Sequence, residues 1–131
     1  MQVEQIEAVC LIKVDDERAN AFSTALIQAL SEEIAMAEAN EEIGAVVIAG
    51  NQKAFFAGFD LGIIGTGDRE KIVEMTSAGG ALIRQAYGSK IPVVAACTGH
   101  AVAAGALMLL GCDYRVGTDA QVKIGLNEVA I

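Results

Sequence analysis

Glu128 is the acidic residue whose neighbours best suit it to proton transfer. It follows the apolar stretch Val122–Ile124, and Val129 and Ile131 come after it. Apolar surroundings disfavour the charged form of a carboxylate, which suits the group to act as a general acid or base near neutral pH. A solvated loop glutamate would have the same sequence, so the residues alone leave both interpretations open.

Two turns built from small residues follow predicted strands and could present backbone N–H groups to a ligand. Ala57–Asp60 closes the segment that begins at Lys53, and Gly99–Gly105 leads from an apolar run into a helix. The first N–H groups of a helix have no partner within it and stabilise negative charge. Two such donors at one point would form an oxyanion hole, which suits thioester chemistry. Close packing of a helix on a sheet requires similar turns, and the residues alone leave that alternative open.

Other kinds of site have little support in the sequence. Neither GxGxxG nor GxxxxGK[ST] occurs, which argues against the common nucleotide-binding loops. His100 is the single histidine, no His/Cys cluster or EF-hand spacing occurs, and a metal site is therefore not expected. A serine triad is not indicated, because GxSxG is absent. His100 follows a glycine in a turn and is expected to line a site or to have a structural role.

The composition is that of a folded α/β protein, with 53% apolar and 20% charged residues. A formal charge of −8 and the absence of Trp argue against a nucleic-acid partner. The three cysteines lie in apolar runs and are expected to be buried free thiols of a reducing compartment. The longest apolar stretch, Ala101–Gly111, is too short for a membrane span, and the N-terminus is polar and acidic. We therefore expect a soluble, cytoplasmic protein.

The hydrophobic pattern predicts strands that alternate with helices, which favours parallel pairing through crossover connections. Strands are expected at 3–6, 8–14, 45–49, 93–97, 113–116 and 122–124, and helices at 24–40, 68–87 and 103–110. Residues 53–60 are expected to form a short strand that passes into a glycine turn. The runs at 45–49 and 93–97 are expected to be covered on both faces. Residues 61–67 are expected to form a glycine-rich loop. The apolar end of the chain suggests that a further segment or a partner chain covers it.

Two blocks of the sequence carry a resemblance to a known family. KAFFAGFDLGII, at residues 53–64, is similar to the crotonase signature in which a strand ends in A-F-x-A-G-x-D-[LI]. Residues 91–131 resemble that superfamily's second block, which has a glycine-rich turn, a buried helix, C-D-[YI]-R and G-L-P-E. The chain thus resembles the N-terminal half of the crotonase (enoyl-CoA hydratase/isomerase) superfamily. The resemblance implies an α/β fold, a crotonase-like ββα spiral with residues 1–131 as its core domain and the C-terminal trimerisation region absent.

The resemblance also implies the roles of individual residues. The N–H groups of Phe59 and Ala104 would form the oxyanion hole for a thioester carbonyl, and Glu128 would be the general acid/base. The residues expected to bind the substrate are Ala57, Gly58, Phe59, Asp60, Leu61 and Leu107. Lys53 and Arg18 are candidates for the CoA phosphates, with solvation as the alternative role. No metal and no separate cofactor is expected, because coenzyme A is part of the substrate.

The sequence departs from the superfamily pattern at three places. The usual glycine triplet is Ala103-Ala104-Gly105, so that the second oxyanion donor carries a methyl group, and Asn127 replaces the usual proline. Leu107 stands where hydratases of the superfamily carry a second glutamate. Water addition in that family uses two carboxylates, whereas a single carboxylate suits proton transfer between two carbons.

The expected activity is therefore Δ3-Δ2 double-bond isomerisation of an enoyl-CoA in fatty-acid metabolism. A 2-enoyl-CoA hydratase and a non-catalytic acyl-CoA-binding protein remain the alternatives. The resemblance implies a homo-trimer or hexamer at full length.

Overall fold

The structure is a computed structural model that describes residues 1–128. Its larger sheet contains β1 (Gln2–Ile6), β2 (Val9–Lys13), β3 (Ala45–Ala49), β5 (Val93–Cys97) and β7 (Tyr114–Gly117), in the order β1-β2-β3-β5-β7. β1 pairs antiparallel with β2 through a tight turn, and the other neighbours are parallel. The predicted strands of this sheet are confirmed to within two residues at each end.

A second sheet is made of three short parallel strands, β4 (Ala54–Phe56), β6 (His100–Val102) and β8 (Ile124–Gly125), in that order. After the opening hairpin, consecutive strands alternate between the larger and the smaller sheet. This arrangement confirms the α/β class and the ββα spiral. β6 was predicted as part of a turn, because a three-residue strand next to glycine has no visible period; its pairing with β4 and β8 makes it a strand.

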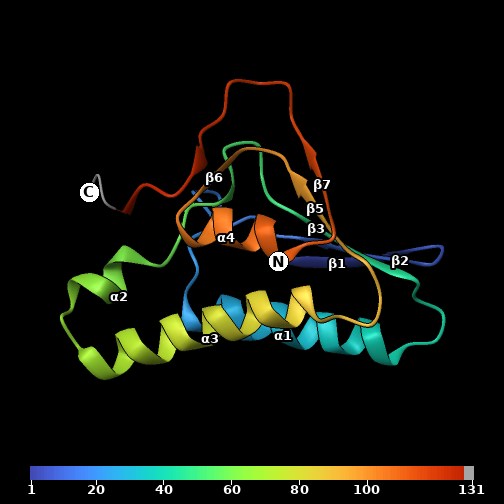
Figure 1. Cartoon of the computed structure of the whole chain (residues 1–131), viewed down its shortest axis with the longest axis horizontal. Helices are drawn as coiled ribbons and strands as arrows, with labels where there is room; N and C mark the ends of the chain where they lie inside the picture. The colour runs from blue at the N-terminus through green and yellow to red at the C-terminus, as the bar shows by residue number, and fades with distance from the viewer. Residues whose placement is uncertain (129–131) are drawn as a thin grey trace.

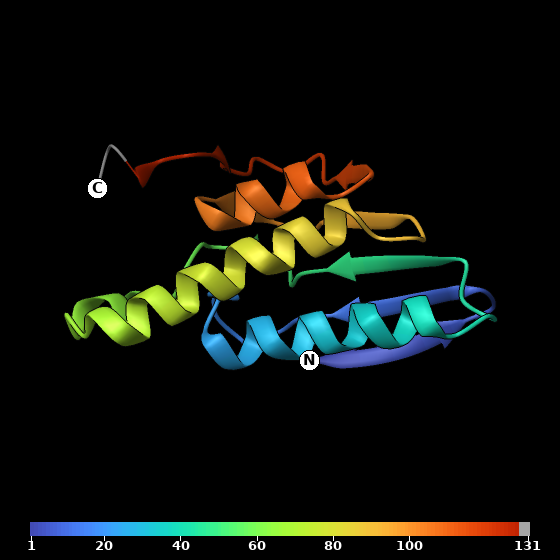
Figure 2. The same cartoon turned by 60° about the horizontal axis from the view of Figure 1, so that its bottom comes forward.

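Three longer helices lie beside one another, and Figure 2 shows them in the order α1, α3, α4. α1 (Thr24–Ala39) is capped by Ser23, whose Oγ accepts from the Leu26 N–H at 3.2 Å, as the sequence predicted. α3 (Arg69–Tyr87) is capped by Asp68, whose carboxylate accepts from the Lys71 N–H at 3.3 Å. α4 (Ala104–Gly111) is short and mostly buried.

The prediction of a loop at residues 61–67 was wrong, because Leu61–Gly65 form a one-turn helix, α2. Asp60 caps it, with Oδ1 accepting from the Gly62 N–H at 2.7 Å. The glycines at 62 and 65 lower helix propensity and hid the turn from the sequence pattern, while the cap and the intervening isoleucines favour it. α2 lies at one end of the molecule, next to the start of α3 (Figure 1).

The core lies mainly between the larger sheet and the helices, and Val46, Ile48, Val93 and Ala95 are buried in it. The expectation that β3 and β5 are covered on both faces was wrong for the described residues. Their alternate side chains, including Val47, Val94 and Ala96, are only half-buried.

All three cysteines are free and buried, as predicted. Burial raises the pKa of the Cys112 thiol to about 11, which leaves it protonated at neutral pH. Within the part of the chain that the structure describes, no helix has both the length and the apolar character needed to cross a membrane.

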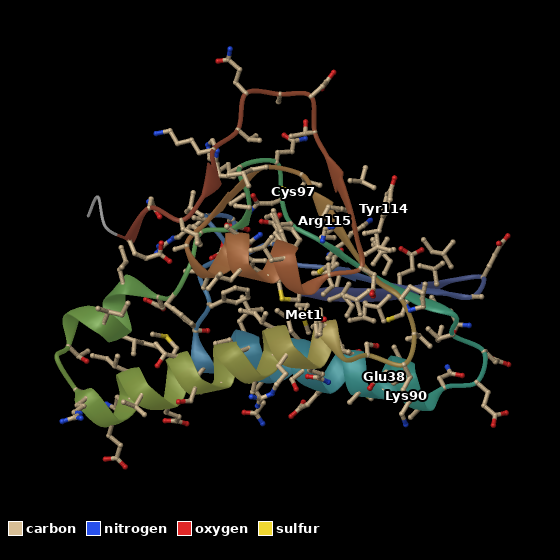
Figure 3. All side chains as sticks on the ribbon, viewed as in Figure 1. Met1, Glu38, Lys90, Cys97, Tyr114 and Arg115 are labelled. Carbon is tan, nitrogen blue, oxygen red and sulfur yellow. The ribbon has the colours of Figure 1, made fainter. Side chains whose placement is uncertain are left out.

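Two side chains form hydrogen bonds that stabilise the connections at the ends of the helices. Glu38, near the end of α1, accepts a 2.8 Å hydrogen bond from the Lys90 N–H, and Figure 3 shows the two residues together. The Arg115 guanidinium donates to the carbonyls of Leu109 and Cys112, at 3.0 and 2.7 Å, and so caps the C-terminal end of α4 (Figure 3). These contacts fix where α3 and α4 return to the sheet.

Candidate active site

The turn after β4 fixes the backbone of Phe59 on one side only. The Phe22 N–H donates to the Gly58 carbonyl at 2.8 Å, and the Asp60 N–H donates to the Phe22 carbonyl at 3.0 Å. In this parallel bridge the N–H of Phe59 itself points away from Phe22. No described residue accepts a hydrogen bond from it. The turn therefore offers one free donor.

The turn after β6 offers a second donor at the start of α4. Ala103 has φ 53° and ψ −126°, a left-handed conformation that favours glycine. The Ala103 carbonyl accepts from the N–H groups of Ala106 and Leu107, at 2.9 and 3.1 Å. The Ala104 N–H has no acceptor among residues 1–128, as is usual for the first residue of a helix. The α4 dipole adds partial positive charge there.

Glycines let the two turns approach each other closely. A Cβ on Gly58, which has φ 91°, would lie 3.0 Å from the Ala103 Cβ and 3.7 Å from the Ala104 nitrogen. A Cβ on Gly105 would lie 2.0 Å from the Phe56 carbonyl oxygen, so only glycine lets α4 pack on β4 here. The free donors of Phe59 and Ala104 thus belong to adjacent turns.

Glu128 follows the third strand of the same small sheet. β8 pairs with β6 through Ala101–Ile124 and Val102–Gly125, and the Ala103 N–H donates to the Gly125 carbonyl at 3.0 Å. β4, β6 and β8 are parallel, so their carboxyl ends meet at one edge of the sheet. Phe59, Ala104 and Glu128 each come two or three residues after one of these ends.

The side chain of Glu128 is exposed, so the described residues do not provide the apolar surroundings expected for it. Within residues 1–128 its carboxylate makes neither a hydrogen bond nor an ion pair. Val129 and Ile131, on which that expectation also rested, lie outside the described residues.

The other predicted substrate-binding residues lie at different places. Ala57 is half-buried and Gly58 is buried in the turn itself, whereas Asp60 caps α2. Leu61 is 69% exposed on α2. Leu107 lies on α4, 37% exposed, where it lines an apolar groove of about 370 Å³ between α3 and α4.

The two candidate phosphate ligands line different pockets. Lys53 donates to the Glu17 carbonyl at 3.3 Å and lines a polar cleft of about 770 Å³. Arg18 lines a different pocket, of about 380 Å³, beside Asp60. His100 has a structural role, because its Nδ1 accepts from the Lys123 N–H at 2.8 Å. Among the described residues, no three His, Cys, Asp or Glu side chains form a metal-binding group.

Asn20 supports the site and was not singled out from the sequence. It is completely buried, and its side-chain amide donates to the carbonyls of Val14, Ala54 and Phe55, at 2.9, 3.1 and 3.2 Å. These bonds tie the end of β2 to β4, just before the Phe59 turn. A polar residue in the connection between a strand and an amphipathic helix was the available signal, but it is common to many loops.

Comparison with known proteins gives a consistent result. A sequence profile described as enoyl-CoA hydratase/isomerase matches residues 4–131. A putative enoyl-CoA hydratase of Thermus thermophilus is 32% identical over all of this chain and 53% of that protein. The crystal structure of an enoyl-CoA hydratase of Mycobacterium ulcerans is 38% identical, with a TM-score of 0.91 over 98% of this chain and 56% of the other.

The apo structure of an enoyl-CoA isomerase of Mycobacterium tuberculosis is 37% identical, with a TM-score of 0.89 over 98% of this chain and 55% of the other. The chain therefore spans about half the length of each of these three proteins.

Proposed function

Because this chain belongs to the enoyl-CoA hydratase/isomerase family, we propose that it carries the thioester site of an acyl-CoA enzyme. One observation carries the proposal: two backbone N–H groups without an acceptor among residues 1–128, and a carboxylate-bearing segment, follow the carboxyl ends of three adjacent parallel strands. The N–H groups of Phe59 and Ala104 donate to the thioester oxygen. They stabilise the negative charge that develops there when an enolate forms.

In the proposed reaction, Glu128 moves one proton within a bound 3-enoyl-CoA. Its carboxylate takes a proton from C2, and the double bond between C3 and C4 extends into a dienolate whose charge lies on the thioester oxygen. The new carboxylic acid of Glu128 returns the proton to C4, and the double bond then lies between C2 and C3. The carboxylate is regenerated, and no other reactant is consumed.

Isomerisation is favoured over hydration because of Leu107. An alkyl side chain there cannot help to hold and split a water molecule, so the proposal assigns the chemistry at the reacting carbons to the Glu128 carboxylate. The similarity to enoyl-CoA hydratases keeps 2-enoyl-CoA hydration as a second candidate, with the second acid supplied elsewhere. A non-catalytic acyl-CoA-binding role is the third, since a methyl group and a strained Ala103 occupy the oxyanion turn.

Product analysis distinguishes these candidates. The protein at its natural length is given 3-enoyl-CoA and 2-enoyl-CoA separately, and 2-enoyl-CoA and 3-hydroxyacyl-CoA are quantified. We expect the wild type to move the double bond, and we expect Glu128→Gln to lower the rate of this isomerisation by about 10²-fold or more. Efficient hydration that persists in Glu128→Gln would reject the proposal, and calorimetric binding without any product over hours would favour the non-catalytic role.

We also propose whether the protein uses a cofactor, how it assembles and where in the cell it lies. Coenzyme A enters as part of the substrate, and no resident cofactor or metal takes part. The exposed apolar residues Leu110, Tyr114 and Val116 support burial in a homo-trimer or hexamer. Three buried free thiols support a reducing, cytoplasmic location.

A further inference from the structure

Gly79, in the middle of α3, lies directly against the aromatic ring of Phe59. A Cβ on Gly79 would lie 2.5 Å from Cε1 and 2.8 Å from Cζ of that ring, and 3.7 Å from the Ile27 Cδ1. The tip of the ring therefore occupies the space that a side chain at position 79 would fill. Gly80, the next residue, is exposed, and a Cβ there would meet nothing within 4 Å.

The other side of Phe59 is held by the aromatic core. Its ring lies 6.4 Å from the ring of Phe22 and tilted by 53°, and Phe22 stacks on Phe56 at 4.4 Å. Phe22 also forms the backbone bridge to Phe59. The ring of Phe59 is thus confined by α3 and by the aromatic core, while its N–H points away from Phe22. A displacement of the ring is transmitted to the N–H through two covalent bonds from Cβ.

We propose that Gly79 is a positioning residue, whose missing side chain seats the Phe59 ring and thereby aims the Phe59 N–H at the thioester oxygen. The inference rests on the proposed function. Glycine in a helix interior is unfavourable relative to alanine, so close approach of the ring gives Gly79 a reason to be there. Ordinary carbon–carbon contacts are at least 3.4 Å long, whereas a Cβ at position 79 would lie 2.5 Å from Cε1 of Phe59. A methyl group would thus push the tip of the ring by roughly 1 Å, and the part of this shift that reaches the N–H lowers the rate, since a misplacement of about 1 Å at the reacting groups can cost on the order of 10²-fold.

The carbonyl stretching frequency of a bound thioester reports directly on the hydrogen bonds that its oxygen accepts, including the one proposed from the Phe59 N–H. A saturated acyl-CoA labelled with ¹³C at the thioester carbonyl is bound to the protein at its natural length, and isotope-difference infrared spectra are recorded. Hydrogen bonds to the carbonyl oxygen lower the stretching frequency. We expect a clear lowering in the wild type and a smaller one in Gly79→Ala, together with a drop in kcat of roughly 10- to 100-fold and a much smaller change in KM.

Two further variants separate an effect on the direction of the Phe59 N–H from a general loss of stability. Phe59→Leu keeps the N–H but removes the ring tip, and the double variant Gly79→Ala/Phe59→Leu lets the new methyl group fill the vacated space. We expect each single change to lose part of the frequency shift and the double variant to regain most of it. Gly80→Ala is the matched control: it should raise Tm through helix propensity and keep the wild-type frequency.

The outcomes distinguish failure of the inference from failure of the proposed function. A wild type that binds the thioester without a frequency shift, or does not bind it, rejects the oxyanion site itself. A normal wild-type shift that is unchanged in Gly79→Ala overturns the role of Gly79 alone. If Gly79→Ala does not fold, Phe59→Leu provides the test. An undiminished frequency shift in that variant would show that the position of the Phe59 ring does not affect the hydrogen bond to the thioester, and the role of Gly79 would be overturned.

Discussion

The N–H of Ala103 donates a 3.0 Å hydrogen bond to the carbonyl of Gly125. This bond extends the pairing of β6 with β8 by one residue, into the turn where α4 begins. It attaches the turn that presents the Ala104 N–H to the segment that carries Glu128 three residues later. The donor and the proposed base are therefore positioned by the same short sheet, although they lie 24 residues apart in sequence.

Ala103 stores strain that glycine would relieve. At φ 53° and ψ −126°, a non-glycine residue costs of order 1–3 kcal/mol, part of which is offset by the larger unfolded-state entropy of glycine. We expect Ala103→Gly to raise the free energy of unfolding by about 1 kcal/mol, measured by denaturant titration. Ala106→Gly, in the adjoining helix, is the control and should lower it by about 1 kcal/mol. A destabilised Ala103→Gly would show that the Ala103 methyl contributes more through packing than it costs in strain.

Asn20 is expected to be among the most sensitive positions of the fold. Asn20→Ala removes the amide donor that the carbonyls of Val14, Ala54 and Phe55 share, although the Ala54 carbonyl still accepts from the Asn51 N–H at 3.0 Å. Each buried group that loses its partner costs roughly 1–3 kcal/mol, so we expect a loss of about 2 kcal/mol or more in unfolding free energy. Asn20→Asp should be at least as harmful, because a carboxylate would face three carbonyl oxygens. A loss below about 1 kcal/mol in Asn20→Ala would mean that water replaces the amide.

Asp68 should make stability depend on acid pH. The Lys71 N–H, followed by the charge of Lys71, holds the pKa of this capping carboxyl below its ordinary value of 3.8. A lowered folded-state pKa means that the stabilisation is fully present above pH 3.8 and is lost as the pH falls below it. Asp68→Asn caps the helix without titrating. The advantage of the wild type over Asp68→Asn in urea unfolding should therefore be the same at pH 6 and pH 5 and shrink as the pH falls below 3.8, and a difference that stays constant there would contradict the assignment.

Residues with a local signal were predictable from the sequence, and residues fixed by distant contacts were not. Ser23 indicates a helix start and the run at 45–49 indicates a strand, and both predictions are confirmed. β6 could not be predicted, because its three residues form a strand only through β4 and β8 on either side. The contact of Gly79 with the Phe59 ring joins residues 20 apart, and no pattern in α3 shows it. The candidate site was predicted through motif resemblance, whereas the lack of an acceptor among residues 1–128 for the N–H groups of Phe59 and Ala104 required coordinates.

Leu107 offers a direct test of why isomerisation is favoured over hydration. Its side chain is 37% exposed, so a charged replacement can be accommodated without burying an unpaired charge. Leu107→Glu supplies the second carboxylate that water addition requires, and Leu107→Gln is the control of matched size. With 2-enoyl-CoA as substrate, we expect 3-hydroxyacyl-CoA to form at least about tenfold faster in Leu107→Glu than in Leu107→Gln, since a positioned general acid or base contributes about 10²-fold or more. Circular dichroism and unfolding curves establish that both variants are folded. Equal hydration by the two would mean that position 107 does not face the reacting carbons, and the preference for isomerisation would then lose its basis.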